Sequence, residues 1–155
     1  MSTSFHFASP NLPLVMVIVA ATGRETKLLN AIVDTGATSC VLSDHLVKEL
    51  GLKQLTVPKS EKMAHGVGGK VEVGIMELKS LTLGNETRKK LKVATMDMRL
   101  INKQIHASGA KKINVDMIIG ASFFSKRKLI IDYSAKTIDI TAGSKSKQRQ
   151  IKRKK

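Results

Sequence analysis

The sequence predicts a mainly β fold with one or two short helices. Its apolar stretches are short and rich in Val, Ile and Leu, and LVMVIVAA at residues 14–21 has the length of one buried strand. Residues 71–75 alternate apolar side chains with a small or charged one, which is the period of a half-exposed strand. A chain of 155 residues that is 42% hydrophobic is expected to form one domain around a single core.

The first elements are strands separated by turn signals. Strands are expected at residues 14–21 and 27–33, joined by a hairpin turn over 21–24, and a small strand is expected at 40–42. Residues 43–51 then favour one short helix. We expect Ser43 at its start to act as the cap, and a glycine to end it at Gly51.

Further strands follow a glycine-rich segment. Three glycines within residues 66–69 predict the tip of a hairpin. The strands expected after this tip are residues 71–75, 78–83, 90–95 and 115–119, and then a closing hairpin of 129–132 and 137–140.

The pattern of apolar residues fades between residues 97 and 114. A polar loop of this length is unusual in a compact domain, so the segment is functional, ordered by a partner, or partly helical. Residues 121–126 predict one or two further helical turns.

The charge is concentrated at the C-terminus. The net charge is +15, and residues 143–155 hold seven Lys or Arg and no acid. A segment with so few apolar residues predicts a disordered basic tail, which we place at residues 142–155. The alternative is that this tail contacts nucleic acid, or serves as a nuclear address in a eukaryotic host.

The remaining chemistry-bearing residues predict no metal and no cofactor. Cys40 is the one cysteine, so no internal disulfide forms, and we expect it to be a small core residue. The four histidines have no metal-ligand spacing, and the glycines at 66–69 lack the Lys-Ser or Lys-Thr of a phosphate-binding loop. These features and the short apolar runs favour a cytoplasmic protein without a membrane span.

One motif places a carboxylate at the end of a predicted buried strand. Residues 31–33 run directly into Asp34, Thr35, Gly36 and Ala37. A strand that opens into a loop here would expose the carboxylate of Asp34 to a cleft. Gly36 has no Cβ, so a substrate or a second loop can approach its backbone closely.

This order of motifs resembles the retropepsin-like aspartic proteases, the single-domain retroviral-type family, over about residues 12–140. Residues 34–37 match the catalytic signature, and Ile118, Ile119 and Gly120 match the structural support beneath the active-site loop. The resemblance implies a closed β-barrel with one lobe per chain, an acid-protease fold, and Thr35 bridging the two loops of a dimer. The implied substrate-binding flap comprises Met63, His65, Gly66, Val67, Gly68 and Gly69.

The resemblance also implies a homodimer. Peptide hydrolysis in aspartic proteases uses two carboxylates that share a proton, and this chain contains no second Asp-Thr-Gly or Asp-Ser-Gly. The expected function is therefore an aspartic endopeptidase that cleaves protein or peptide substrates through a water activated by Asp34 of both subunits. The sequence departs from the retroviral branch at Thr38 and Ala121, where an acid and an arginine are usual.

The expected domain organisation is an N-terminal arm at residues 1–11, the protease-like domain at 12–141 and the basic tail. Two alternatives stay open. One is a non-catalytic peptide-binding module on the same fold, and the other is a nucleic-acid-associated protein that acts through the tail.

Overall fold

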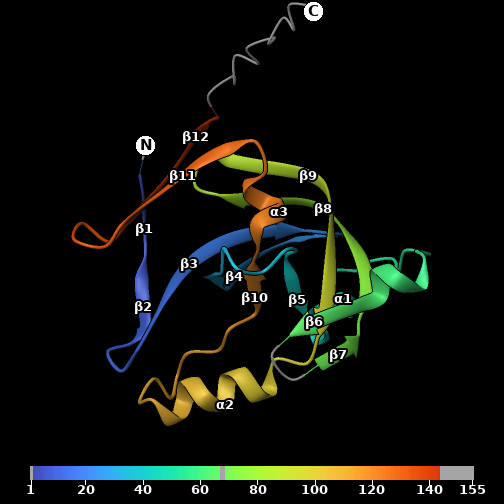
Figure 1. Cartoon of the computed structure of the whole chain (residues 1–155), viewed down its shortest axis with the longest axis horizontal. Coiled ribbons are helices and arrows are strands. Elements are labelled where there is room, and N and C mark those ends of the chain that lie inside the picture. Colours follow the sequence, from blue (N-terminus) through green and yellow to red (C-terminus); the bar gives the residue numbers. More distant parts are fainter. Residues whose placement is uncertain (1, 67–68, 144–155) are drawn as a thin grey trace, which may run out of the picture.

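The core of the fold is a closed β-barrel (Figure 1). The computed structural model describes residues 2–66 and 69–143, except for the side chains of residues 61–72. Six strands close the barrel, because β8 pairs with both β9 and β3. In order around the barrel these are β3 (Leu12–Thr22), β4 (Thr26–Val33), β10 (Met117–Ile119), β5 (Val41–Ser43), β9 (Glu86–Met96) and β8 (Gly74–Leu83).

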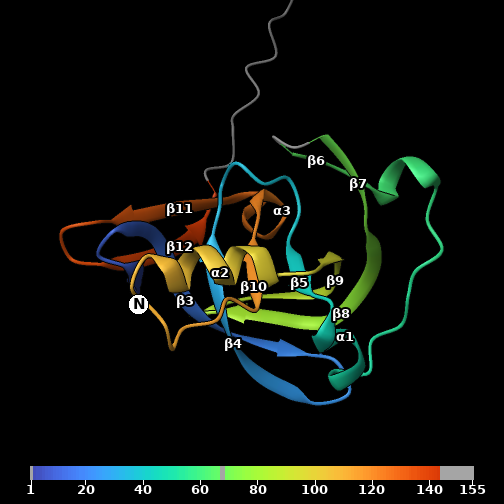
Figure 2. The ribbon, with the colours of Figure 1, turned by 90° about the horizontal axis from the view of Figure 1, so that it is seen from below.

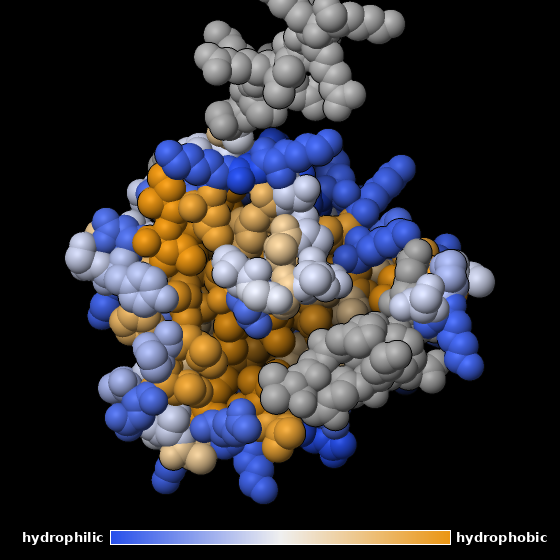
Figure 3. Space-filling view, viewed as in Figure 1, coloured by the Kyte–Doolittle hydropathy of each residue, from blue (hydrophilic) through white to orange (hydrophobic). Residues whose placement is uncertain are grey.

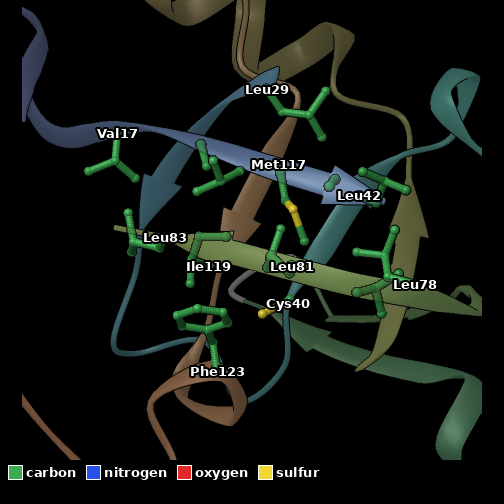
Figure 4. Close-up of a cluster of buried hydrophobic side chains, with 14 of the residues drawn as sticks. Val17, Leu29, Cys40, Leu42, Leu78, Leu81, Leu83, Met117, Ile119 and Phe123 are labelled. Atoms are coloured by element: carbon green, nitrogen blue, oxygen red, sulfur yellow. The ribbon is translucent and has the colours of Figure 1, made fainter. Parts of the chain in front are cut away.

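The barrel is filled mainly by aliphatic side chains, and only 3% of the residues in the chain are aromatic. Leu42, Leu78, Leu81, Met117 and Ile119 are all fully buried. Figure 4 shows these side chains converging from different strands, with Cys40 and Phe123 at one end of the cluster. Cys40 is 0% exposed, which confirms its prediction as a core residue.

Two smaller sheets flank the barrel. The first has the order β1 (Thr3–Ser4), β12 (Thr137–Ala142) and β11 (Arg127–Asp132), so the predicted closing hairpin is confirmed. The second is the hairpin of β6 (Met63–Gly66) and β7 (Gly69–Glu72). β2 (His6–Ser9) extends the barrel sheet at β3, so the expected N-terminal arm contains two short strands.

The predicted helix at 43–51 is shorter than expected. α1 spans His45–Glu49, Asp44 occupies its N-cap position, and Ser43 is the last residue of β5. The prediction that Ser43 caps the helix was therefore wrong, because its hydroxyl is hydrogen-bonded to Nδ1 of His45 at 2.7 Å. Gly51 follows the helix with a φ of +61°, a conformation that suits glycine at a helix end.

The segment 97–114 is partly helical. α2 (Arg99–Ala107) lies outside the barrel, where Ile105 packs with Met16 and Ile32 in a second small core. The apolar face of α2 is narrow, which is why the segment looked polar in the sequence. The other helices are η1 (Lys59–Lys62) and α3 (Ala121–Phe124). No helix of the described chain is long and apolar enough to cross a membrane.

The strand expected at 71–75 is also divided. β7 ends at Glu72 and β8 begins at Gly74, so the chain leaves the small hairpin and enters the barrel at Val73. Val73 is buried with Ile75 and Ala94 in a third apolar cluster. The burial of Val73 at this junction explains why the alternating pattern continues across the break.

Candidate functional site

The Asp34 loop, residues 34–40, leaves the barrel at the end of β4 and returns into β5. β10 lies between these two strands, parallel to β4 at Ile119 and Val33 and antiparallel to β5 at Ile118 and Val41. The backbone N–H of Asp34 donates to the carbonyl oxygen of Ile119 at 3.0 Å. The parallel pairing of β4 and β10 therefore continues up to the carboxylate-bearing residue itself.

The loop turns tightly and holds its carboxylate at the surface. Asp34, Thr35 and Gly36 are exposed, and Ala37 is half-buried. The N–H of Gly36 donates to Oδ1 of Asp34 at 3.0 Å, and the N–H of Ala37 donates to the backbone oxygen of Asp34 at 3.1 Å. The loop thus orients the carboxylate with backbone groups of its own and leaves it open to solvent.

Gly120 lies directly beneath the loop. A Cβ at this position would be 2.2 Å from the carbonyl oxygen of Ser39 and 2.9 Å from that of Ala37. Both neighbours are backbone atoms, which cannot rotate away as a side chain can. A glycine is therefore required where β10 passes under the loop, which gives a physical reason for the Ile-Ile-Gly pattern.

Backbone hydrogen bonds join the loop to α3. The N–H of Ala121 donates to the oxygen of Ala37 at 2.7 Å, and the N–H of Ser122 donates to the oxygen of Thr38 at 3.1 Å. Each bond involves one of the two positions, Ala121 and Thr38, at which retroviral enzymes usually carry an arginine and an acid. In this chain the start of α3 is held against the loop without that ion pair.

Two further side chains support this region from beneath. Sγ of Cys40 lies 3.7 Å from Oγ of Ser122, and burial raises the pKa of the Cys40 thiol above its ordinary value. Nε of Arg88 donates to the carbonyl oxygen of Phe123 at 2.8 Å, and its guanidinium also donates to that of Ser125. Sequence reasoning missed Arg88, because it stands in a run of cationic residues that resembles an ordinary solvated strand.

The predicted flap is a hairpin, as its glycine content suggested. Met63 pairs with Glu72, His65 with Lys70 and Gly66 with Gly69. Val67 and Gly68 lie outside the described residues. Figure 2 shows the β6–β7 hairpin and the Asp34 loop on the same side of the barrel. The structure thus places the two sequence-predicted parts of the site on one face.

This face is rich in apolar surface. Figure 3 looks onto it and shows a broad hydrophobic area around the centre, with hydrophilic side chains mainly at the periphery. An apolar surface beside an exposed carboxylate is suited to contacts with another protein chain.

The cavity of about 650 Å³ found elsewhere in the protein lies at the other end of β10. Its lining includes Ser43, His45, Asn102 and Asp116, which surround the start of that strand, whereas Gly120 follows its end. It is therefore not a pocket at Asp34.

In the described part of the chain, no three His, Cys, Asp or Glu side chains converge in a group that could hold a metal ion.

The sequence itself matches a protein-family model. Residues 17–123, more than half of the chain, match the family described as aspartyl protease. The matched region begins in β3 and ends in α3, so it includes the Asp34 loop, the hairpin and the strand that ends at Gly120. No curated protein matches the chain.

The chain is similar to several solved structures, and the first of them shows the same fold. A retropepsin-like aspartic protease from Rickettsia conorii superposes with a TM-score of 0.57 at 15% identity, covering 92% of this chain and 91% of that one. The EIAV protease in complex with the inhibitor HBY-793 matches at 22% identity and a TM-score of 0.48, covering 72% of this chain and 85% of its own. The retroviral protease-like domain of Ddi1 from Leishmania major matches at 17% identity and a TM-score of 0.48, with coverages of 83% and 92%.

Proposed function

This chain belongs to the aspartyl protease family, and on that premise we propose that it is a homodimeric aspartic endopeptidase with Asp34 of each subunit in its active site. The family and the retropepsin-like fold support a peptidase role. The observation that carries the proposal is the exposed carboxylate of Asp34. The N–H of Gly36 donates to this carboxylate and orients it. Gly120 lies beneath the loop, where the backbone leaves no space for a Cβ.

A single subunit supplies only half of the chemistry. In the described part of the chain, no second Asp or Glu side chain is hydrogen-bonded to Asp34. A twofold axis close to the loop would bring Asp34 of the partner subunit beside it. Two carboxylates at close range do not both ionise readily, so the pair would share one proton.

The proton-sharing pair can then hydrolyse a peptide bond. The ionised carboxylate takes a proton from a water molecule, whose oxygen attacks the peptide carbonyl carbon. The protonated carboxyl group donates its proton to the carbonyl oxygen, which gives a tetrahedral diol. Collapse of the diol breaks the C–N bond: the protonated carboxyl group donates its proton to the leaving amine nitrogen, and the ionised carboxylate takes a proton from one diol hydroxyl group, which leaves the carboxylic acid product. The pair returns to its one-proton state without any cofactor.

The β6–β7 hairpin has a proposed role in binding. The backbone of an extended peptide can pair with strand edges, and a hairpin that covers it excludes water from the carboxylates. The apolar surface around the loop favours substrate segments with apolar side chains.

The function is tested by digestion of a complex peptide library across about pH 4 to 7, the range in which coupled carboxylates can share a proton. Wild type and Asp34→Asn are compared, and the cut sites are identified by mass spectrometry. Cuts that only the wild type makes support the proposal. The proposal is overturned if a folded, dimeric wild type makes none, since a non-catalytic peptide-binding module would then explain the fold.

The dimer is tested separately by mixing the two proteins. With free exchange of subunits, an equal mixture should retain about a quarter of the wild-type activity if each site needs two intact Asp34 residues. Retention of about a half would mean that each subunit acts alone and would exclude the shared pair. Wild type mixed with an equal amount of an unrelated inert protein provides the control for dilution.

A further inference from the structure

The chain before residue 143 carries most of its net positive charge at one end. We call this the basic end, and it comprises Lys79, Arg88, Lys89, Lys90, Lys92, Lys126, Arg127 and Lys128, with Glu77 and Glu86 as its acids. Of the 27 Lys and Arg in the chain, eight lie here and seven lie in residues 143–155, which leaves twelve. Those twelve are nearly balanced by the other ten Asp and Glu of the chain's total of 12.

Contacts between β9 and β11 bring these cations together. Oε1 of Glu86 lies 2.9 Å from Nε of Arg127 and 3.4 Å from Nε of Arg88. On the adjacent hairpin strand, β8, Glu77 lies opposite Lys92 and Ser80 opposite Lys89, so Lys79 belongs to the same end. The seven cations other than Arg88 are exposed. Figure 3 shows hydrophilic side chains along this upper edge of the molecule.

The basic tail starts at the same place. Arg127 lies opposite Ala142, the last residue of β12, and a Cβ on Gly143 would be 2.8 Å from the carbonyl oxygen of Lys126. Gly143, the last described residue, therefore lies beside Lys126 and Arg127. The seven Lys and Arg of residues 143–155 follow this point in the sequence.

Two lysines of the basic end have a backbone conformation that allows a matched substitution. Three non-glycine residues of the described chain have a positive φ, and all three are lysines: Lys90 at 50°, Lys126 at 60° and Lys136 at 52°. Glycine or asparagine is the usual residue in this conformation, and a lysine there is strained. Two of the three, Lys90 and Lys126, lie in the basic end, so glycine can replace both without backbone strain.

We propose that the basic end binds the phosphate backbone of double-stranded nucleic acid. A duplex is a long polyanion with closely spaced charges, and its phosphates are bound by Lys and Arg without regard to sequence. The basic end contains no aromatic side chain, so it lacks the stacking surfaces on which proteins hold single strands. This interaction is independent of the proposed protease activity, because the Asp34 loop contributes none of these residues.

The test uses the full-length protein and a fluorescent DNA duplex of about 20 base pairs, with binding followed by anisotropy from about 50 to 200 mM salt. The informative variant is the double substitution Lys90→Gly and Lys126→Gly, since glycine suits both backbone conformations. We expect weaker binding, a slope of log K against log salt that is smaller by about 1.8, and no loss of thermal stability.

The matched control is Lys136→Gly. It removes one lysine with the same backbone conformation, but Lys136 lies in the turn between β11 and β12, at the far end of that hairpin from Lys126. Its salt slope should equal that of the wild type. Equal slopes for the wild type and the double variant would overturn the proposal. It would also be overturned if a single-stranded oligonucleotide, or vesicles of equal parts phosphatidylcholine and phosphatidylserine, bound more tightly than the duplex.

Discussion

Two aspartates, Asp116 and Asp34, lie at opposite ends of the paired segments of β4 and β10, and they differ in burial and in hydrogen bonding. Asp116 precedes β10 and is half-buried, and its Oδ2 accepts a hydrogen bond from the N–H of Asn30 at 3.0 Å. Its backbone also bonds to Asn30 and to Ser43, on β4 and β5. Asp34 follows β4 and is exposed, and its carboxylate accepts from Gly36, two residues further along the same loop.

The difference distinguishes a structural carboxylate from one that is available for chemistry. The carboxylate of Asp116 joins two segments 86 residues apart, whereas that of Asp34 joins none. The loop around Asp34 is held instead by backbone hydrogen bonds to β10 and α3. Stability at the Asp34 end should therefore depend on the backbone geometry, and stability at the Asp116 end on side chains. The predictions below follow this contrast from the largest change in the free energy of unfolding to the smallest.

The largest loss of stability is expected for Gly120→Ala. The new methyl group would meet the carbonyl oxygens of Ser39 and Ala37, so the loop must move away from β10. We expect the free energy of unfolding to fall by about 3 kcal/mol, with loss of any Asp34-dependent cleavage, because overpacking against backbone is poorly relieved. Urea unfolding and peptide cleavage measure the two effects.

Gly109→Ala is the matched control for that substitution. Gly109 has a φ of +115° and nothing within 4 Å of its added Cβ, whereas Gly120 has an extended backbone that any residue can adopt. The alanine at 109 should cost about 1 kcal/mol from backbone strain alone. If both variants lost the same stability, close packing beneath the Asp34 loop would not be the reason that position 120 needs glycine.

Asp116→Ala should cost about 2 kcal/mol. The substitution leaves the N–H of Asn30 without its acceptor in a partly buried position, and an unsatisfied donor costs more than the hydrogen bond contributes. Asp116→Asn keeps a carbonyl oxygen at the same place and should cost less than half as much. Chemical denaturation of both variants measures the difference. An asparagine variant as unstable as the alanine variant would mean that the negative charge, rather than the acceptor, matters at this end.

Asn102→Ala should cost about 1 kcal/mol. Nδ2 of Asn102 donates to the oxygen of Val115 at 3.3 Å, and Oδ1 accepts from the N–H of Val115 at 2.6 Å, so α2 is joined to the chain just before β10. The adjacent Lys103 is exposed and gives the control Lys103→Ala, which should change stability by less than about 0.5 kcal/mol. Equal effects of the two substitutions would remove Asn102 from the account of how the Asp116 end is held.

The sequence predicted the Asp34 end of the molecule better than the Asp116 end. The strands around Asp34 have unbroken apolar cores, and the glycines that permit close backbone approach are visible as residue types. Gly120 was predicted as structural support from its resemblance to a family motif, and the structure adds the physical reason, which is the lack of space for a Cβ. The partner of Asp116 has no such local signal, because the N–H of Asn30 that donates to its carboxylate lies 86 residues earlier in the chain.

The features that escaped prediction depend on residues far apart in the chain. The sequence did not decide whether residues 97–114 are helical, because the apolar face of α2 is stabilised only by packing against β3 and β4. The role of Arg88 depends on the position of α3, 35 residues later. Ser43 was assigned to a helix cap, although the pairing of β5 with β9 extends the strand through that residue. Each of these three features depends on tertiary contacts, which a local sequence pattern does not reveal.

The smallest change in stability is expected for Asp34→Asn, the substitution with the largest expected effect on activity. The asparagine keeps an oxygen that can accept from the N–H of Gly36, and Asp34 is exposed, so the free energy of unfolding should change by less than about 0.5 kcal/mol. Wild type and variant are compared by urea unfolding at one protein concentration, because the stability of a dimer depends on concentration. A loss of more than about 1.5 kcal/mol would make Asp34 a structural residue like Asp116 and would remove the contrast between the two ends. Unchanged stability, with cleavage lost, would instead mean that the carboxylate of Asp34 contributes nothing to the free energy of unfolding, as expected for a group that serves only in catalysis.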